Sequence, residues 1–237
     1  MKANAVVLLS GGQDSTTALF WAKREFGQVH ALSIWYGQRH AAELSAAEAI
    51  ADAAGVPWTN YTLPGGVLGV GSALVVQGGG LANTPHLAAS GGLPDAEMPQ
   101  GLPTSFVPGR NMVFLALAAS MAAGMGARRV VTGVCQTDYS GYPDCRKVFV
   151  DAMAEAASLA MPSSMRPMEI VTPMMGLTKA QTVELAMELP GCMEALSFSV
   201  TCYHGKRPGC GTCPACLLRA AGFREAGVPD PSEGDVL

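Results

Sequence analysis

Basic residues and long apolar runs are both scarce in this sequence. Lysine and arginine number 15 against 19 aspartate and glutamate residues, which gives a formal net charge of −4. A chain of this kind has no standing electrostatic attraction to nucleic acid or to an anionic membrane. No apolar run reaches the ~18 residues that a membrane-spanning helix needs. We therefore expect no nucleic acid and no membrane among its partners.

Two further signals are missing. Residues 1–4 lead directly into a short apolar run, without the longer apolar segment and cleavage site of a secretory signal. We therefore expect a cytoplasmic protein. The sequence also contains no GxxxxGK[ST] motif, which excludes the commonest phosphate-binding loop.

The pattern of apolar residues indicates an α/β protein. Hydrophobic residues make up 49% of the 237, enough for one large domain with a small appendage. Short apolar runs predict strands at residues 5–9, 30–36, 57–63, 128–135 and 169–171. Helical periodicity predicts helices at residues 16–24, 41–54, 111–126, 147–160 and 178–189. Alternation of strands and helices predicts a doubly wound parallel sheet with right-handed crossovers.

Composition divides the chain further. We expect an α/β domain over residues 1–198, a metal-binding segment over 199–222 and a loose tail over 223–237. Glycine and proline interrupt any periodicity between residues 64 and 104. A loop of this length inside a compact domain is usually functional or disordered, so we interpret it as a flap near a ligand.

A serine- and glycine-rich loop follows the first predicted strand. Residues 10–15 read SGGQDS and lead into a helix. Glycine lets the backbone approach an anion closely, and the N–H groups and dipole of a helix start favour negative charge. Ser10 and Ser15 add hydroxyl donors, whereas Asp14 has the alternatives of capping the helix or holding a cation. The loop has the form of the pyrophosphate loop (PP-loop) of ATP pyrophosphatases.

Polar clusters follow two other predicted strands. YGQRH at 36–40 comes after the second strand, and a segment at 136–146 with two carboxylates, two tyrosines and an arginine comes after the fourth. Ligands of an open parallel sheet bind beyond the carboxyl ends of its strands. The three clusters therefore converge on one edge, which we predict to be the active site.

Two cations stand at predicted helix starts, where the helix dipole gives them no support. Arg110 begins one helix and Lys179 another. An anionic ligand such as phosphate would explain both. The alternatives are an arginine paired with a surface carboxylate and a solvated lysine.

Four of the seven cysteines have the spacing C-x7-C-x2-C-x2-C. Cys202, Cys210, Cys213 and Cys216 match a tetrahedral zinc site whose four ligands leave no open position, so we predict a structural role. An iron–sulfur cluster uses the same four ligands. Nothing else in the chain indicates electron transfer, which favours zinc.

With these motifs in view, the chain resembles the 7-cyano-7-deazaguanine synthase family of the PP-loop ATP pyrophosphatase superfamily. The matching stretches are LLSGGQDSTT at 8–17, YGQRH at 36–40, FVPGRN at 106–111, TGVCQTDYSGYPDCR at 132–146, and TCYHG with CGTCPACLLR at 201–219. The resemblance implies an adenine nucleotide alpha hydrolase-like fold and a homodimer in queuosine biosynthesis.

The resemblance also implies a reaction. Substrates would be 7-carboxy-7-deazaguanine, ammonia and two ATP, with Mg²⁺ accompanying the ATP. The carboxylate would be adenylated, ammonia would displace AMP to give an amide, and a second adenylation would lead to the nitrile. Because water would hydrolyse the adenylate, the 64–104 stretch is a candidate lid.

Site residues follow from the matched motifs. ATP would be held by Leu9, Ser10, Gly11, Gly12, Gln13, Asp14, Ser15, Thr16 and Arg110. The deazaguanine would be lined by Tyr36, Gln38, His40, Asp138, Ser140, Asp144 and Arg146. Arg110 and Lys179 would offset phosphate charge, and Asp14 completes the catalytic candidates at the loop. His40 is the candidate for proton transfer, with hydrogen bonding to substrate or a structural role as alternatives.

Two other functions compete with this interpretation. Another PP-loop enzyme, such as a tRNA thiolation enzyme, would need a basic surface and a persulfide-bearing cysteine, for which Cys145 is the candidate. A zinc-ribbon binding module would need no polar clusters on a sheet edge.

Overall fold

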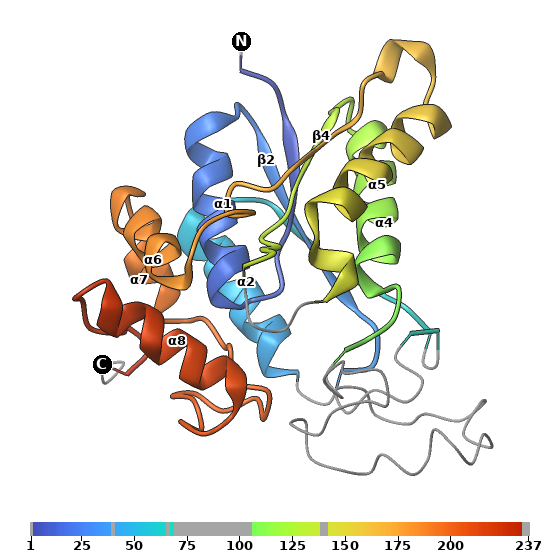
Figure 1. The fold of residues 1–237 in the computed structure, drawn as a ribbon. Coiled ribbons are helices and arrows are strands. Elements are labelled where there is room, and N and C mark those ends of the chain that lie inside the picture. The colour runs from blue at the N-terminus through green and yellow to red at the C-terminus, as the bar shows by residue number, and fades with distance from the viewer. Residues whose placement is uncertain (1, 39–40, 65–66, 69–105, 138–141, 234–237) are drawn as a thin grey trace, which may run out of the picture.

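A parallel sheet stands at the centre of the molecule in the computed structural model (Figure 1). The structure describes residues 2–38, 41–64, 67–68, 106–137 and 142–233. The strands are β1 (Ala5–Leu8), β2 (Val29–Trp35), β3 (Trp58–Thr62), β4 (Arg129–Val131) and β5 (Glu169–Val171). They lie in the order β3-β2-β1-β4-β5, and every neighbouring pair is parallel. The predicted doubly wound parallel sheet is confirmed.

Helices cover both faces of this sheet. They are α1 (Gln13–Glu25), α2 (Ala42–Ala54), α4 (Arg110–Gly124), α5 (Lys147–Ala160), α6 (Lys179–Glu188), α7 (Cys192–Leu196) and α8 (Pro214–Glu225). Short 3-10 turns lie at Pro143–Cys145 and Ser163–Met165. Figure 1 shows α4 and α5 on one side of the sheet and α1, α2, α6 and α7 on the other. No helix of the described residues is both long and apolar enough to cross a membrane.

Each face has its own apolar core, because side chains of buried strands alternate between the two sides. Val7 and Leu9 pack with α1, α2 and α6, whereas Val6 and Leu32 pack with α4. Small residues such as Ala18, Ala47 and Ala118 are fully buried, which lets the helices approach the sheet closely. The second predicted helix ends where Gly55 adopts the left-handed conformation at φ 63°.

The main difference at a helix boundary is in α1. It begins at Gln13 rather than Thr16, so half of the loop motif is already helical. The sequence patterns also missed α7 and α8 altogether. Thr178 and Gln181 form a capping box at the start of α6.

The chain after residue 222 differs from the expected loose tail. Helix α8 continues to Glu225, and Asp230 forms a buried ion pair with Arg219 of that helix. Only Pro64, Val67 and Leu68 of the predicted flap at 64–104 fall within the described residues. Leu68 packs beside Tyr36 and Val107. The proposed division at residue 198 remains a prediction.

Candidate functional site

Strand order fixes where a ligand can bind. From β1 the chain builds β2 and β3 on one side of the sheet, and it then crosses back to build β4 and β5 on the other side of β1. The sheet therefore reverses its winding between β1 and β4. Ligands of doubly wound sheets bind at this reversal, outside the carboxyl ends of the strands. The SGGQDS loop follows β1 at that point, and the other two predicted clusters follow β2 and β4. All three therefore begin at one edge of the sheet.

The loop is shaped by glycine. Gly11 has a φ of 85°, and a Cβ there would lie 2.3 Å from the backbone oxygen of Glu43. The Gly11 oxygen accepts a 2.9 Å hydrogen bond from the nitrogen of Val200, so the loop is fixed from a second side. Gly12 is the N-cap of α1 and has no side chain to cap the helix. The first N–H groups of α1 are therefore available to an anion.

The hydroxyl groups of the loop have different tasks. Ser15 is buried, and its hydroxyl donates to the Gly12 oxygen at 3.0 Å and lies 3.0 Å from the Ser10 hydroxyl. Thr16 donates to the same Gly12 oxygen at 2.8 Å. These two side chains hold the loop in shape. Ser10 is exposed, which leaves it the freer of the two serines for a ligand.

Gln13 presents a buried amide without a partner. Its side chain is 2% exposed, and its Nε2 makes no hydrogen bond within the part of the chain that the structure describes. Buried polar groups are nearly always hydrogen-bonded, because leaving a donor unpaired costs about 1–3 kcal/mol. An acceptor on a ligand bound at the loop would satisfy this amide.

Asp14 and Lys179 form an ion pair across two helix starts. The Lys179 Nζ lies 2.9 and 2.8 Å from the two Asp14 oxygens. The lysine side chain is only 10% exposed, so the alternative of a solvated lysine is wrong. Helix α8 packs directly behind it, because a Cβ on Gly222 would lie 2.5 Å from the Lys179 Cγ. The pair sets one positive and one negative group beside the loop.

Arg110 is the first residue of α4. It contacts the YGQRH cluster at 36–40, which follows β2. Its NH1 donates to the Tyr36 hydroxyl at 3.3 Å. Burial alone would lower the pKa of Arg110, but Tyr36 and the Asp144 carboxylate raise it above its usual value. The guanidinium is therefore charged at any working pH.

Asp144, in the polar cluster at 136–146, connects that cluster to the start of α4. Its Oδ2 accepts the Asn111 backbone N–H at 3.1 Å, and its backbone oxygen accepts the Asn111 amide at 3.1 Å. The same amide donates to the Cys145 sulfur at 3.3 Å. The Asp144 Oδ1 is buried and has no hydrogen-bond donor among the described residues. After the Gln13 amide, it is the second buried polar group at this edge without a hydrogen-bond partner among the described residues, and it can act only as an acceptor when ionised.

The remaining predicted site residues divide into placed and unplaced ones. The Gln38 side chain accepts from the Tyr36 backbone N–H at 2.8 Å and donates to the Ile34 oxygen at 3.3 Å, so it shapes its own turn. Arg146 is exposed at the N-cap of α5. His40, Asp138 and Ser140 lie outside the described residues.

Sequence patterns missed Glu43. It lies in the first turn of α2, and its backbone contacts the loop at Gly11. Burial raises the pKa of Glu43 to about 7, although the Arg110 charge lowers it. The one sequence feature that could have pointed to Glu43 is its position three residues after the YGQRH motif. The signal was weak because acidic residues are common in first helical turns.

The four clustered cysteines come together as predicted. The sulfur atoms of Cys202, Cys210, Cys213 and Cys216 all lie within 4.8 Å of one another. The Cys210 and Cys216 sulfurs are 3.9 Å apart. Zinc–sulfur bonds of about 2.3 Å in a tetrahedron put sulfurs about 3.8 Å apart, so the four thiols fit a zinc ion.

Donors around the cluster favour thiolates. The Cys210 sulfur accepts from the Thr212 hydroxyl at 3.4 Å and the Cys213 backbone N–H at 3.3 Å. The Thr212 hydroxyl holds the pKa of Cys210 at about 5. Burial raises the pKa of Cys216 to about 12, so a cation held here would have to complete the deprotonation of this thiol.

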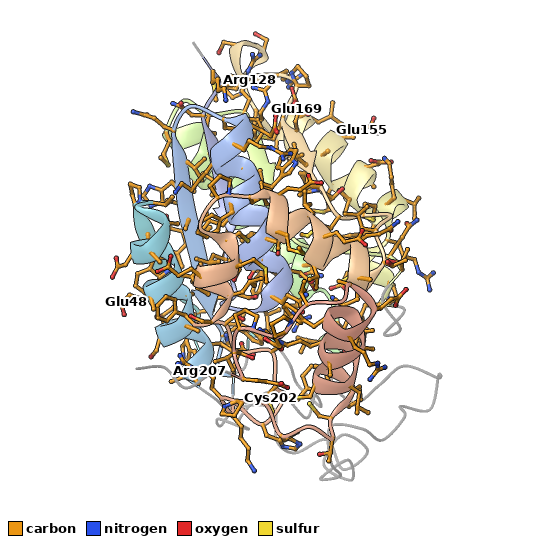
Figure 2. The ribbon with its side chains drawn as sticks, turned by 90° about the vertical axis from the view of Figure 1, so that its left-hand side faces the viewer. Glu48, Arg128, Glu155, Glu169, Cys202 and Arg207 are labelled. Carbon is orange, nitrogen blue, oxygen red and sulfur yellow. The ribbon has the colours of Figure 1, made fainter. Side chains whose placement is uncertain are left out.

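The segment that leads into this cluster contacts the loop, although the two are far apart along the chain. Figure 2 shows Cys202 at the opposite end of the molecule from Arg128, which precedes β4, and therefore toward the carboxyl edge of the sheet. Val200, two residues before Cys202, donates to Gly11. Ser199 and Thr201 accept from Arg219 of α8 at 2.7 and 3.0 Å. The cysteine segment is therefore tied to the loop through Val200.

Comparison with known proteins gives matches over nearly the whole chain. The family model described as queuosine biosynthesis protein QueC matches residues 4–227. A 7-cyano-7-deazaguanine synthase of Laribacter hongkongensis is 53% identical over 228 residues, which make up 96% of this chain and 93% of that protein. One of Bacillus subtilis is 42% identical over 226 residues, 94% and 95% of the two chains.

A solved structure also shows similarity at low identity. The predicted subunit of a tRNA methyltransferase of Methanocaldococcus jannaschii has a TM-score of 0.48 at 17% identity, over 78% of this chain and 76% of that one.

Proposed function

The chain belongs to the QueC family of queuosine biosynthesis enzymes, and from this membership we propose its reaction in detail. The enzyme converts 7-carboxy-7-deazaguanine and ammonia to 7-cyano-7-deazaguanine and consumes two ATP. The observation that carries this proposal is the SGGQDS loop between β1 and α1. It lies at the reversal of the sheet and presents free helical N–H groups to an anion.

ATP binds with its phosphates on this loop. The binding residues are Leu9, Ser10, Gly11, Gly12, Gln13, Asp14, Ser15, Thr16 and Arg110. The unpaired Gln13 amide donates to the nucleotide, which removes the cost of its burial. Lys179 and Arg110 offset phosphate charge from two sides. Asp14 keeps lone pairs beyond its bond to Lys179, so it would hold the Mg²⁺ that accompanies ATP and offsets charge on the leaving pyrophosphate.

The chemistry follows from what each step needs. The substrate carboxylate attacks the α-phosphate of ATP and expels pyrophosphate, which gives a mixed anhydride with AMP as a good leaving group. Ammonia displaces AMP to form the amide. The amide oxygen attacks a second ATP, and loss of AMP leaves the nitrile. Cationic side chains and helical N–H groups around the loop stabilise the negative charge that develops on the phosphates.

The flat heterocycle binds beside the second and third polar clusters. The lining residues are Tyr36, Gln38, His40, Asp138, Ser140, Asp144 and Arg146. The free Asp144 Oδ1 accepts from the N–H and amino groups of the guanine-like edge. Arg146 binds the substrate carboxylate. The 64–104 stretch stays a candidate lid, and His40 is a candidate for proton transfer.

The four cysteines bind one structural zinc ion that leaves no coordination position for substrate. The enzyme is a cytoplasmic homodimer, and its substrates are small molecules rather than nucleic acid. The mass in solution tests the homodimer, and the location in the cell tests the cytoplasmic assignment.

The decisive experiment incubates the enzyme with ATP, Mg²⁺, ammonium and 7-carboxy-7-deazaguanine, followed by mass spectrometry. Nitrile, AMP and pyrophosphate are expected, with two AMP for each nitrile. Omission of the carboxylated base should stop AMP formation. ADP in place of AMP would overturn the proposed attack on the α-phosphate.

A further inference from the structure

Glu43 occupies the boundary between the two halves of the site. Its helix, α2, begins beyond the carboxyl end of β2, which also supplies Tyr36. Its backbone oxygen lies where a Cβ of Gly11 would be, so residue 43 packs directly on the phosphate-binding loop. The charge of Arg110 acts on its carboxyl group, and Arg110 also donates to the Tyr36 hydroxyl. Glu43 therefore lies between the loop for ATP and the cluster for the heterocycle.

The Glu43 carboxyl group is only partly exposed, and Arg110 is near enough for its charge to act on it. Arg110 also donates to the Tyr36 hydroxyl at 3.3 Å. A ligand placed between the loop and Tyr36 would therefore lie beside this carboxyl group.

Burial also gives this carboxyl group the acidity of a general base. Desolvation raises the pKa of Glu43 to about 7, and the Arg110 charge lowers it but does not cancel the effect. A base works best when its pKa lies near the working pH. At neutral pH a substantial fraction of Glu43 is ionised and able to take a proton.

The proposed reaction needs such a group at one step in particular. After the amide oxygen is adenylated, its nitrogen carries two protons, and both must leave to give the nitrile. The first dissociates to water from the cationic adenylate, and the second leaves as AMP is expelled. In the last event the electron pair of an N–H bond becomes the third carbon–nitrogen bond. The carbon–oxygen bond breaks, its electron pair leaves with AMP, and the proton needs an acceptor. Adenylation of the carboxylate transfers no proton and needs none.

We propose that Glu43 is a catalytic residue that accepts a proton from the substrate nitrogen as the adenylated amide becomes the nitrile. This inference rests on the proposed function. It assigns to α2 a chemical role distinct from the binding of phosphate, which belongs to α1 and the loop.

The test compares two partial reactions in the full-length, zinc-loaded enzyme. The first is exchange of labelled pyrophosphate into ATP, driven by 7-carboxy-7-deazaguanine, which reports acid adenylation alone. The second is formation of nitrile from the synthetic amide and ATP. Glu43→Gln, which keeps size but accepts no proton, should leave exchange nearly unchanged and slow nitrile formation by about 100-fold or more.

Two matched variants accompany it. Glu48→Gln makes the same change on the exposed side of α2, where Figure 2 shows the side chain pointing away from the molecule, and should leave both reactions unchanged. Glu43→Asp retains a carboxylate and should recover part of the nitrile rate. Zinc content and melting temperature, measured on each, establish that the variants are folded.

Each outcome has one meaning. Nitrile formation at the wild-type rate in Glu43→Gln would overturn the inference. Loss of exchange together with nitrile formation would also overturn it, because the residue would then act on nucleotide binding. A wild-type enzyme without acid-dependent exchange would refute the proposed function itself, which is distinguishable from both.

Discussion

At the scale of single residues, Gly133 controls how closely two parts of the site approach. It follows β4, and a Cβ there would lie 2.8 Å from the carbonyl carbon and oxygen of Asp14 in the first turn of α1. Real Cβ atoms do not come this close to backbone, so Gly133→Ala must push β4 and α1 apart. We expect a loss of about 1–3 kcal/mol in the free energy of unfolding and weaker ATP binding. Urea denaturation and calorimetric titration with ATP measure these.

Gly124 supplies the matched control. It is the last residue of α4, and no atom lies within 4 Å of a Cβ built there. Gly124→Ala should leave ATP affinity unchanged and stabilise the protein by up to about 1 kcal/mol, because alanine favours the helix. If Gly133→Ala behaves like Gly124→Ala, the close contact at Asp14 does not exist in solution.

At the scale of elements, α8 is tied to the segment after it by a buried ion pair. The Arg219 guanidinium contacts both Asp230 oxygens, at 2.5 and 2.8 Å, and each side chain is 7% exposed. Burial alone would raise the pKa of Asp230, but hydrogen bonds and charge from Arg219 lower it below its usual value. Asp230→Asn leaves a buried cation uncompensated, so we expect a loss of about 3–5 kcal/mol at neutral pH.

The pH dependence of this loss has a fixed sign. A carboxyl group whose pKa is lowered by folding stabilises the native state above its unfolded pKa of about 3.9. That stabilisation disappears as the pH falls through the lower, folded pKa. The difference between wild type and Asp230→Asn, measured by denaturation, should therefore be constant from pH 7 to about 5 and shrink below about pH 4. A difference that grows on acidification would contradict the assignment.

Asp151→Asn is the control for this pair. Asp151 forms an ion pair with Lys147 one turn away on α5, but both side chains are about 60% exposed. Solvent screens such a pair, so the loss should be about 0.5 kcal/mol or less at any pH.

Sequence patterns predicted the main elements because these elements are periodic. The runs that became β1 and β2 are apolar and buried on both faces, and the helix stops at Gly55 and Pro190 are local signals. Helices α7 and α8 were missed because their placement depends on tertiary partners. Leu196 and Phe223 are buried against other elements, which a local pattern does not contain.

The site was predictable in outline for a similar reason. The loop motif and cysteine spacing are local, and both sets of residues come together as expected. The pair of Asp14 with Lys179 joins residues 165 positions apart, and Glu43 meets Gly11 through helix packing. No local sequence pattern predicts contacts between residues so far apart along the chain.

At the scale of the whole molecule, two contacts join the cysteine segment at 199–222 to the SGGQDS loop. Val200, two residues before Cys202, donates to Gly11. Helix α8, which carries Cys216, packs through Gly222 on Lys179, the partner of Asp14. A metal ion held by the four cysteines would therefore be connected to the loop on which we propose that ATP binds.

Removal of the metal should consequently weaken ATP binding. Because metal-binding free energy is folding free energy in such sites, the segment at 199–222 should lose its structure when a chelator removes zinc. The loop then loses the Val200 contact, and Lys179 loses its support. We expect the Kd for ATP to rise by about tenfold or more, which corresponds to about 1.4 kcal/mol, together with a lower melting temperature.

Re-addition distinguishes this coupling from general damage. Zinc restored to the chelated protein should recover both ATP affinity and melting temperature, whereas Mg²⁺ at the same concentration should recover neither, since Mg²⁺ prefers oxygen ligands over thiolates. Unchanged ATP affinity in metal-free protein would separate the two sites. The contacts at Gly11 and Lys179 would then serve packing alone, and the proximity of the cysteines to the loop would have no consequence for nucleotide binding.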